Sequence, residues 1–589
     1  MKEVLSIYEA RIEMFSLSRK RYNHQLRISG IIRLLAFLAT IAGIYFFWNS
    51  WQAAVAIAIA GIATFLILVA RHENLKQKRN YYEELLRINE QEIAVGNGDY
   101  EDMPAGNEFE EDDHDYSRDI DLFGIGSFFQ YLNRTALKEG RQQLASHLTA
   151  NKIIGITARQ EAIAELGKML DFRQEYEATA RLLENNTRPT VIVDWIKSYK
   201  PFVPYIYSWL CYLQFAFSLI TAVLYGMDVI GGYWLAGVFF IGLLISGRYV
   251  KQLLILHNYI SELEGFFIQY GKLLELIEKT DFKGVVLQGL KDQVITTGRT
   301  ASGRLQDLGK AIVRLDQGSN MLMGIFVNAF GLWNLKQTHS IEVWLKENKE
   351  FIAPWLEAVA QIDAMNSLGN FAYNHPNYSY PEIKEGDFQL KAAQVIHPLL
   401  DPGKAVGNTI DIHTGEFFII TGANMAGKST FLRTISMSIV MANVGLPIWA
   451  ESMDYAPIKL ITSMRTSDSL KDDESYFFSE LKRLKFIVDK MEREKYFIVL
   501  DEILKGTNSV DKASGSRKLI EKLTRKNATG IIATHDLSLT EVANEHEHIS
   551  NYYFDAQIIN DELFFDYTFK TGVATNMNAS FLLKKMGIV

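Results

Sequence analysis

The sequence predicts an all-helical region with two apolar helical hairpins, followed by an α/β domain at the C-terminal end. Three observations carry this prediction: two pairs of charge-free apolar runs, long amphipathic helical patterns around them, and alternating strand and helix patterns after residue 385. Hydrophobic residues make up 48% of the 589 positions and charged residues 22%, which is typical of a folded protein. This length is enough for about three to five structural units.

Charge and cysteine content exclude several classes of protein. The formal net charge of −8 argues against a generally basic protein that coats nucleic acid. Cys211 is the single cysteine, so the sequence has neither an intramolecular disulfide framework nor a cysteine-cluster metal site.

The first apolar hairpin is predicted over residues 31–70. The first 26 residues are polar and basic and lack a cleavable signal-peptide pattern, and a cytoplasmic helix is predicted over residues 1–30. The apolar runs Leu34–Trp48 and Ala53–Ala70 are each close to the length that spans a bilayer, and the short link between them requires an antiparallel pair. A cytoplasmic helix follows over 71–98. Both open ends carry basic residues, which places them in the cytoplasm by the positive-inside rule: Arg19, Lys20, Arg21, Arg27, Arg71, Lys76, Lys78 and Arg79.

A second hairpin is predicted over residues 202–247. Phe202–Met227 and Val229–Gly247 carry no charge, and Asp228 stands between them where an outer turn belongs. The flanking basic residues are Lys197, Lys200, Arg248 and Lys251. The chain is therefore expected to be an integral membrane protein with four transmembrane helices and with its termini on the cytoplasmic side. The alternative is that both pairs are buried hairpins of a large soluble core.

The remaining segments connect these hairpins to the C-terminal domain. Residues 99–121 are strongly acidic and predict a solvated, disordered linker. Amphipathic helical patterns over 122–200 and 248–385 predict a helical core in two parts. After Pro376 and Pro381 the pattern becomes strand, turn and helix, which predicts an α/β domain over 386–589.

A phosphate-binding loop is predicted between a strand at Glu416–Thr421 and an apolar-periodic helix. The pattern G-x-x-x-x-G-K-S stands in the strand-to-helix context that this motif requires. The helix adds the positive end of its dipole, so the loop and the first helical turn are candidate ATP-binding residues. These residues are Gly422, Ala423, Asn424, Met425, Ala426, Gly427, Lys428, Ser429 and Thr430.

The end of the motif and two later strands supply side chains that could bind Mg²⁺ and catalyse ATP hydrolysis. Lys428 would reach the phosphates as a catalytic point charge, and Ser429 would offer its hydroxyl to Mg²⁺. A second strand, Tyr496–Leu500, runs into Asp501 and Glu502, which we interpret as the second Mg²⁺ ligand and the general base. A third strand, Thr529–Thr534, precedes His535, a candidate catalytic residue that senses the γ-phosphate.

These motifs resemble the ATPase domain of the MutS family of DNA mismatch repair proteins. The similar segments are Thr421–Thr430, Ser475–Glu480, Asp501–Ser509, Ala533–His535, His397–Pro398, Gly572–Ala574 with Asn576, and, upstream, parts of 121–160. The resemblance implies a P-loop ATPase of ABC type that uses ATP and Mg²⁺, forms a homodimer through its ATPase domains, and has DNA as a partner. It further implies that Ser475 reaches the partner's nucleotide and that adenine packs near Lys404–Asn408.

The sequence departs from the family at several places. A membrane hairpin stands where the family has its mismatch-reading domain, and a second one interrupts the helical core. Asp472–Glu474 precede Ser475, and Leu504 replaces a glycine. These features predict a membrane-anchored MutS-like ATPase without the mismatch-recognition domain, in which ATP drives a clamp or lever. DNA contacts would need helical-core lysines such as Lys272, Lys283 and Lys291.

Two other functions stay open. An ABC-type transporter half-subunit has the same order of membrane part and ATPase, but four spans are counted rather than six, and no Leu-Ser-Gly-Gly-Gln segment precedes Asp501. The second is a membrane ATPase switch that does not act on DNA, or a structural membrane protein with a degenerate site. The complete set of nucleotide-site residues argues against degeneracy.

Overall fold

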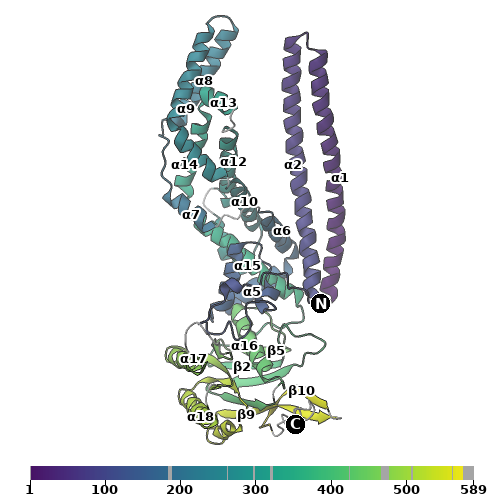
Figure 1. The fold of residues 1–589 in the computed structure, drawn as a ribbon, viewed down its shortest axis with the longest axis vertical. Helices are drawn as coiled ribbons and strands as arrows, with labels where there is room; N and C mark the ends of the chain where they lie inside the picture. Colours follow the sequence, from purple (N-terminus) through teal and green to yellow (C-terminus); the bar gives the residue numbers. More distant parts are fainter. Residues whose placement is uncertain are drawn as a thin grey trace.

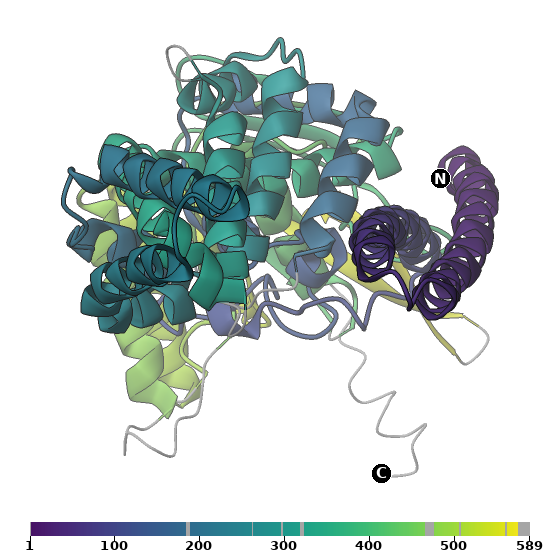
Figure 2. The ribbon, with the colours of Figure 1, turned by 90° about the horizontal axis from the view of Figure 1, so that it is seen from above.

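The computed structural model describes residues 2–183, 189–261, 263–295, 299–318, 323–423, 425–465, 476–505, 508–559 and 562–574. A helical region precedes a C-terminal α/β domain, as the sequence predicts. The molecule is elongated, with the α/β domain at one end and two helical hairpins reaching away from it (Figure 1). Seen from above, the first hairpin stands apart from the other helices (Figure 2).

The first hairpin consists of α1 (Lys2–Phe46) and α2 (Trp51–Gly96). Both helices continue without a break through the apolar runs and the polar segments predicted as separate helices. The apolar halves lie at the tip, and the buried residues of α2 all fall between Leu85 and Val95, at its base. The hairpin therefore packs on the rest of the protein only at the end opposite its apolar tip.

The second hairpin consists of α8 (Tyr207–Gly226) and α9 (Gly232–Ser261). With α1 and α2 these are the four helices, among the described residues, that are long and apolar enough to cross a membrane. Most of their apolar side chains are exposed, and the two tips point to the same end of the molecule (Figure 1).

The other helices form a core around α15 (Ile352–Asn374), a long helix that is buried along most of its length. Trp355 in α15 is fully buried. The helices that surround α15 or extend from this core toward the second hairpin are α3 (Phe128–Leu132), α4 (Lys138–Thr149), α5 (Ile156–Lys168), α6 (Leu170–Arg181), α7 (Pro189–Ser198), α10 (Glu264–Lys279), α11 (Val285–Val294), α12 (Ala301–Gly318), α13 (Met323–Gly331) and α14 (Trp333–Asn348).

The acidic segment 99–121 is not the solvated, disordered linker that its composition predicts. It contains a short 3₁₀ helix, η1 (Asn107–Phe109), and Tyr116 and Ile120 are almost fully buried. Three of its carboxylates face basic and N–H groups of the α/β domain, so these three charges act as counterions of that domain. These contacts are Asp115 with Lys490 (3.0 Å), Asp119 with the Arg465 N–H (2.8 Å), and Asp121 with Arg465 (2.5 Å) and Arg433 (3.0 Å).

The α/β domain contains two sheets. A six-stranded sheet has the order β10-β9-β4-β8-β7-β6, parallel except for β10, and a four-stranded sheet has the order β1-β5-β2-β3. The strands are β1 (Glu382–Ile383), β2 (Gln389–Val395), β3 (Asn408–His413), β4 (Phe417–Gly422), β5 (Ser452–Tyr455), β6 (Lys459–Ser463), β7 (Tyr496–Asp501), β8 (Thr529–Ala533), β9 (Ile549–Ile559) and β10 (Glu562–Thr571). The helices are α16 (Lys428–Val444), α17 (Tyr476–Met491), α18 (Ser509–Arg525) and the 3₁₀ helix η2 (Leu537–Asn544). Because β1 belongs to the small sheet, this domain begins slightly before the predicted boundary at residue 386.

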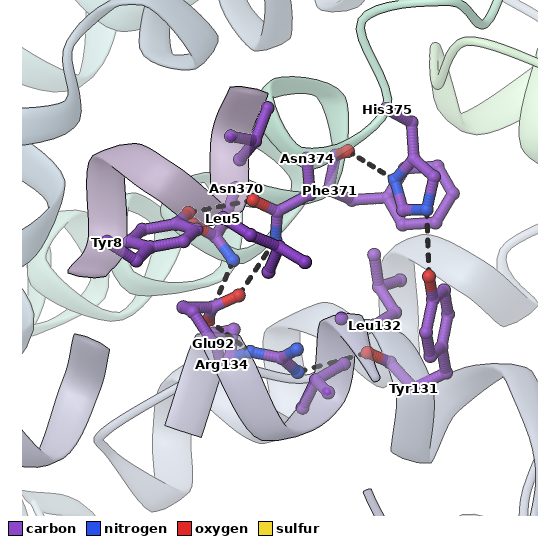
Figure 3. A pocket seen from close by; sticks show the side chains of 13 residues that line it. Leu5, Tyr8, Glu92, Tyr131, Leu132, Arg134, Asn370, Phe371, Asn374 and His375 are labelled. Carbon is purple, nitrogen blue, oxygen red and sulfur yellow. Dashed lines mark hydrogen bonds and ion pairs between the residues drawn. The ribbon is translucent and has the colours of Figure 1, made fainter. Parts of the chain in front are cut away.

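A buried ion pair joins the base of the first hairpin to the helical core (Figure 3). Glu92 of α2 accepts a hydrogen bond from Arg134 at 2.5 Å, and both side chains are almost completely buried. Asn370 and Asn374 of α15 donate to the same carboxylate at 3.0 and 2.7 Å. Burial alone would raise the pKa of Glu92, but the charge and hydrogen bond of Arg134 hold it below the ordinary value.

Removing Glu92 should strongly destabilise the joint. In Glu92→Ala the Arg134 guanidinium would stay buried without its partner, which typically costs about 3–5 kcal/mol. We expect a clearly lower thermal unfolding midpoint for the purified full-length protein. The control is Asp489→Ala, which removes an exposed pair with Lys485 and should change stability by about 0.5 kcal/mol or less. Equal midpoints for the two variants would contradict the role of the Glu92–Arg134 pair.

Candidate nucleotide-binding site

Three parallel strands bring the predicted site residues to one edge of the large sheet. The strands β4, β8 and β7 are neighbours in that order, so their carboxyl ends lie side by side. Ala533 at the end of β8 is paired with Ile420 on one side and Asp501 on the other. The loop after β4, the acidic pair after β7 and His535 after β8 therefore converge, as the sequence predicts for parallel strands.

The loop after β4 turns sharply at two glycines. Gly422 has a φ of +142°, and a Cβ there would lie 2.5 Å from the Phe554 carbonyl oxygen. Gly427 has a φ of +105° and immediately precedes α16. Only glycine adopts these conformations without strain, which explains both fixed glycines of the motif. Between them Ala426 is buried and Met425 is largely exposed, and Asn424 lies outside the described residues.

Lys428, the first residue of α16, folds back across this loop. Its ammonium group donates hydrogen bonds to the carbonyl oxygens of Gly422 at 2.8 Å and Ala423 at 2.9 Å. Burial lowers the pKa of Lys428, because the charged form loses water, while the nearby acidic groups oppose this shift. An anion in the loop would favour the charged amine, so this position suits a phosphate.

Ser429 and Asp501 form a pair of oxygen donors beside the loop. The Ser429 hydroxyl donates to the Asp501 carboxylate at 2.7 Å. A hydroxyl and a carboxylate are hard oxygen ligands of the kind that Mg²⁺ accepts together with phosphate oxygens and water. Within the described ranges no three His, Cys, Asp or Glu residues cluster as a metal site. The Ser429 and Asp501 oxygens fit a magnesium ion that completes its coordination with phosphate oxygens and water.

Glu502 and His535 form the second pair. The His535 Nε2 lies 2.8 Å from the Glu502 carboxylate and 3.3 Å from the Lys428 Nζ. The hydrogen bond from His535 is the main cause that lowers the pKa of Glu502 to about 2, so this carboxylate is ionised at neutral pH. Glu502 is held with a φ of +50° by a hydrogen bond from its N–H to the Ala533 carbonyl oxygen at 2.9 Å. The geometry presents an ionised carboxylate beside the loop.

These groups line an open pocket of about 470 Å³. Its walls include the predicted residues Ala423, Met425, Gly427, Lys428, Ser429, Thr430, Asp501, Glu502 and His535. Gly422 and Ala426 support the loop, and Ser475 lies outside the described residues.

Two wall residues were not predicted, Lys505 and Tyr567. Lys505 lies 3.7 Å from the Glu502 carboxylate, and its place three residues after Glu502 was the signal that could have found it. Tyr567 comes from β10, more than a hundred residues after the loop, and no motif marks it. The Asn408 side chain fixes this part of β10, donating to the Tyr567 carbonyl oxygen at 3.0 Å and accepting from the Phe569 N–H at 2.7 Å. Asn408, the last residue of the segment predicted to pack adenine, therefore contacts the strand that carries Tyr567.

The helix α16 connects the pocket to the helical region. It begins at Lys428 and ends at Val444, where Arg159 of α5 donates to the carbonyl oxygens of Asn443 and Val444 at 2.5 and 3.2 Å. Arg433, in the middle of α16, pairs with Asp121 of the acidic segment at 3.0 Å. A shift of the loop would therefore be transmitted to α5 and to the acidic segment through one continuous helix.

Comparison with known proteins identifies the domain that carries this pocket. Residues 418–584 match the family described as MutS domain V. In each of two strains of Clostridium kluyveri, the DNA mismatch repair protein MutS is 31% identical to this chain over 216 residues, which is 35% of this chain and 25% of the relative. The match thus spans about a quarter of the length of these relatives. Over this C-terminal part the chain is therefore similar to MutS proteins.

Proposed function

We propose that this protein is a membrane-anchored ATPase of the MutS family. It would hydrolyse ATP to move the helices that connect its α/β domain to the two hairpins. The observation that carries the proposal is the arrangement around Lys428: the Ser429–Asp501 pair and the Glu502–His535 pair both border the same pocket. Transfer of a phosphoryl group to water requires a group that binds the phosphates, ligands for the metal ion and a general base.

ATP would bind with its phosphates against the loop and the start of α16. Backbone N–H groups of such a loop and the helix dipole favour the negative phosphates. Lys428 would exchange its bonds with the Gly422 and Ala423 carbonyl oxygens for bonds with phosphate oxygens. The base would pack near Lys404–Asn408 and Tyr567, where Asn408 fixes the backbone of β10.

Ser429 and Asp501 would hold Mg²⁺ on the phosphates. When bound, the ion neutralises the negative charge that develops on the transferred group. Glu502 would accept a proton from the attacking water, since its carboxylate is ionised at neutral pH. His535, bonded to Glu502 and close to Lys428, would keep this carboxylate oriented toward the phosphate end of the pocket.

The homodimer is proposed from the family resemblance. In a dimer formed through the α/β domains, Ser475 of one subunit would reach the nucleotide of the other, so ATP would join the two chains. Hydrolysis would then separate them and move α16. The contacts of α16 with Arg159 and Asp121 would pass this motion to the helical region.

Membrane anchoring is proposed for both hairpins. Their apolar side chains are exposed, their tips lie at the same end of the molecule, and the α/β domain lies at the opposite end (Figure 1). One bilayer could therefore hold all four helices, with the basic residues at the open ends and the ATPase domain in the cytoplasm. The helical arms below the membrane would then act as the levers.

DNA is proposed as a partner on the strength of the family, and one cleft is suited to receive it. An open cleft of about 750 Å³ lies between α2 and α10 and is lined by Lys76, Lys78 and Lys272. Lys283 and Lys291 do not line this cleft, and the Lys291 ammonium donates to the Thr280 carbonyl oxygen. The second candidate is a membrane switch that does not act on DNA, which the net charge of −8 favours.

Replacing the proposed base should stop turnover without preventing ATP binding. We expect Glu502→Gln to lower the rate of ATP hydrolysis by about 10²–10⁴-fold, because amide nitrogen and oxygen do not accept the proton. The variant should retain bound ATP and Mg²⁺, measured by filter binding next to the steady-state assay. Glu541→Gln, an exposed change of the same type outside the pocket, should hydrolyse ATP at the normal rate. If Glu502→Gln hydrolyses ATP at the normal rate, Glu502 is not the general base.

The lowered pKa of Glu502 predicts a pH-dependent contribution to stability. Because folding lowers this pKa from 4.5 to about 2, the stabilisation is complete above the unfolded pKa and is lost as the pH falls through the folded pKa. The thermal midpoint of the wild type minus that of Glu502→Gln should be constant near neutral pH. It should decrease as the pH is lowered from about 5 to about 3. A difference that grows on acidification would contradict the lowered pKa.

DNA stimulation separates the two candidate functions. ATP hydrolysis by the detergent-solubilised protein would be measured alone and with homoduplex, mismatched or branched DNA. If DNA stimulates hydrolysis, the double change Lys78→Ala and Lys272→Ala should weaken the effect and reduce its salt dependence. Lys485→Ala on α17 is the matched control, since Lys485 is exposed outside the cleft. If no DNA stimulates hydrolysis, the membrane switch that does not act on DNA is the better function.

A further inference from the structure

A third uncharged stretch of the chain lies beside the second hairpin. All residues from Gln317 to Leu335 are uncharged, and Asp316 and Lys336 bound the stretch. It is too short for a helical hairpin and is divided among three helices, so it does not resemble a complete membrane span. Its central described part is α13, which lies against α8 and α9 at the level of the upper half of the first hairpin (Figure 1).

The chain leaves and re-enters this region at nearly the same point. Gly318 at the end of α12 lies against Trp333 at the start of α14, where a Cβ on Gly318 would be 2.4 Å from the indole ring. Asn328 of α13 donates to the Gly318 carbonyl oxygen at 3.2 Å and accepts from the Asn334 N–H at 2.9 Å. Leu332, between α13 and α14, has a φ of +49° that reverses the path. The end of α12 and the start of α14 therefore lie side by side, and α13 is bonded to both.

The membrane hairpin satisfies the polar groups at the end of α13. The last carbonyl oxygens of a helix lack partners within the helix. Here Ser218 donates to the Phe330 carbonyl oxygen at 2.8 Å, Gln214 to that of Ala329 at 3.2 Å, and Ser246 to that of Asn328 at 3.4 Å. Such bonds are what non-spanning backbone requires at membrane depth, where water is absent.

The contact lies inside the apolar run of α9. Gly242 approaches the Ala329 carbonyl so closely that a Cβ at this position would overlap it. Gly242 precedes Gly247, where the uncharged run ends, by five residues or about 7.5 Å of helix. Phe239, closer to the tip, packs on Phe326 and Phe330 with ring centroids 6.1 and 5.5 Å apart. The segment thus reaches below the surface of the proposed bilayer.

The outer face of α13 is apolar and exposed, and the neighbouring helices α8 and α14 carry interfacial side chains. Ile325 is 47% exposed and Phe326 55% exposed. Below them, the Lys336 ammonium lies 4.3 Å from the centre of the Tyr212 ring, and the Trp333 indole donates to the Arg314 carbonyl oxygen at 2.7 Å. Lysine, tyrosine and tryptophan side chains are typical of the boundary between lipid and water.

We propose that α13 is a re-entrant membrane helix that lies in the cytoplasmic leaflet and presents Ile325 and Phe326 to lipid acyl chains. The apolar surface of α13 continues that of α8 and α9, so the same lipid would cover both. The inference rests on the proposed membrane anchoring of the second hairpin. It adds a fifth membrane contact, between the levers α12 and α14, to the four predicted spans.

Single cysteines can test this placement in the full-length protein in liposomes. Cys211→Ser removes the only thiol and keeps a donor for the Leu332 carbonyl oxygen. On this background Ile325→Cys and Phe326→Cys report on α13, Leu219→Cys on the exposed apolar face of α8, and Glu350→Cys on an exposed cytoplasmic position. The measurements are the rate of reaction with a water-soluble maleimide and, after coupling a fluorophore in denaturant and refolding into liposomes, quenching by lipids spin-labelled along the acyl chain.

We expect both α13 cysteines to react on the order of tenfold or more slowly than Glu350→Cys, because the thiolate is disfavoured in lipid. We also expect the fluorophores to be quenched by the lipid label. If Ile325→Cys and Phe326→Cys react like Glu350→Cys while Leu219→Cys is protected, α13 is not re-entrant and the anchoring stands. If Leu219→Cys also reacts rapidly, the anchoring itself fails. Protection without lipid quenching would mean that protein covers α13, which overturns the proposal.

Discussion

The buried ion pair between Glu92 and Arg134 is the constraint on which the arrangement of the molecule depends. Three parts of the chain meet there: the base of α2, the segment after α3, and the C-terminal end of α15 through Asn370 and Asn374. Desolvating two charges is expensive, and the two amide donors reduce that cost by satisfying the remaining carboxylate lone pairs. The buried pair is therefore stable only when all three parts are in place. This requirement fixes the position of the first hairpin relative to the core.

Electrostatics also hold the α/β domain to the helical region. Asp115, Asp119 and Asp121 lie against basic and N–H groups of that domain, and Arg159 lies against the carbonyl end of α16. Because Asp121 touches Arg433 on the helix that begins at the phosphate loop, these contacts lie on the direct path from the proposed nucleotide to the levers. Buried apolar residues of the helical core and of the α/β domain form one continuous cluster, so these polar contacts orient a packed junction.

Features encoded by local sequence were the ones that could be predicted. The strands ending at Gly422, Asp501 and Ala533 and the four apolar helices carry their signals within a few neighbouring residues, and the structure contains all of them. The acidic segment was mispredicted because composition shows charge but not the counterions that come from residues far along the chain. Tyr567 and α13 were missed for a similar reason. Tyr567 reaches the pocket through strand pairing, and α13 is too short to stand out before its partners on α8 and α9 are known.

The first hairpin has a mechanical consequence that follows from its length. The helix α2 has 46 residues and contacts the core only near its base, so it spans about 69 Å as one rigid rod. A rotation of about 5° at the base would carry its far end roughly 6 Å sideways. Small adjustments around one carboxylate would thus be magnified at the tip of the hairpin, which we propose lies in a bilayer, with no need for the helix itself to bend.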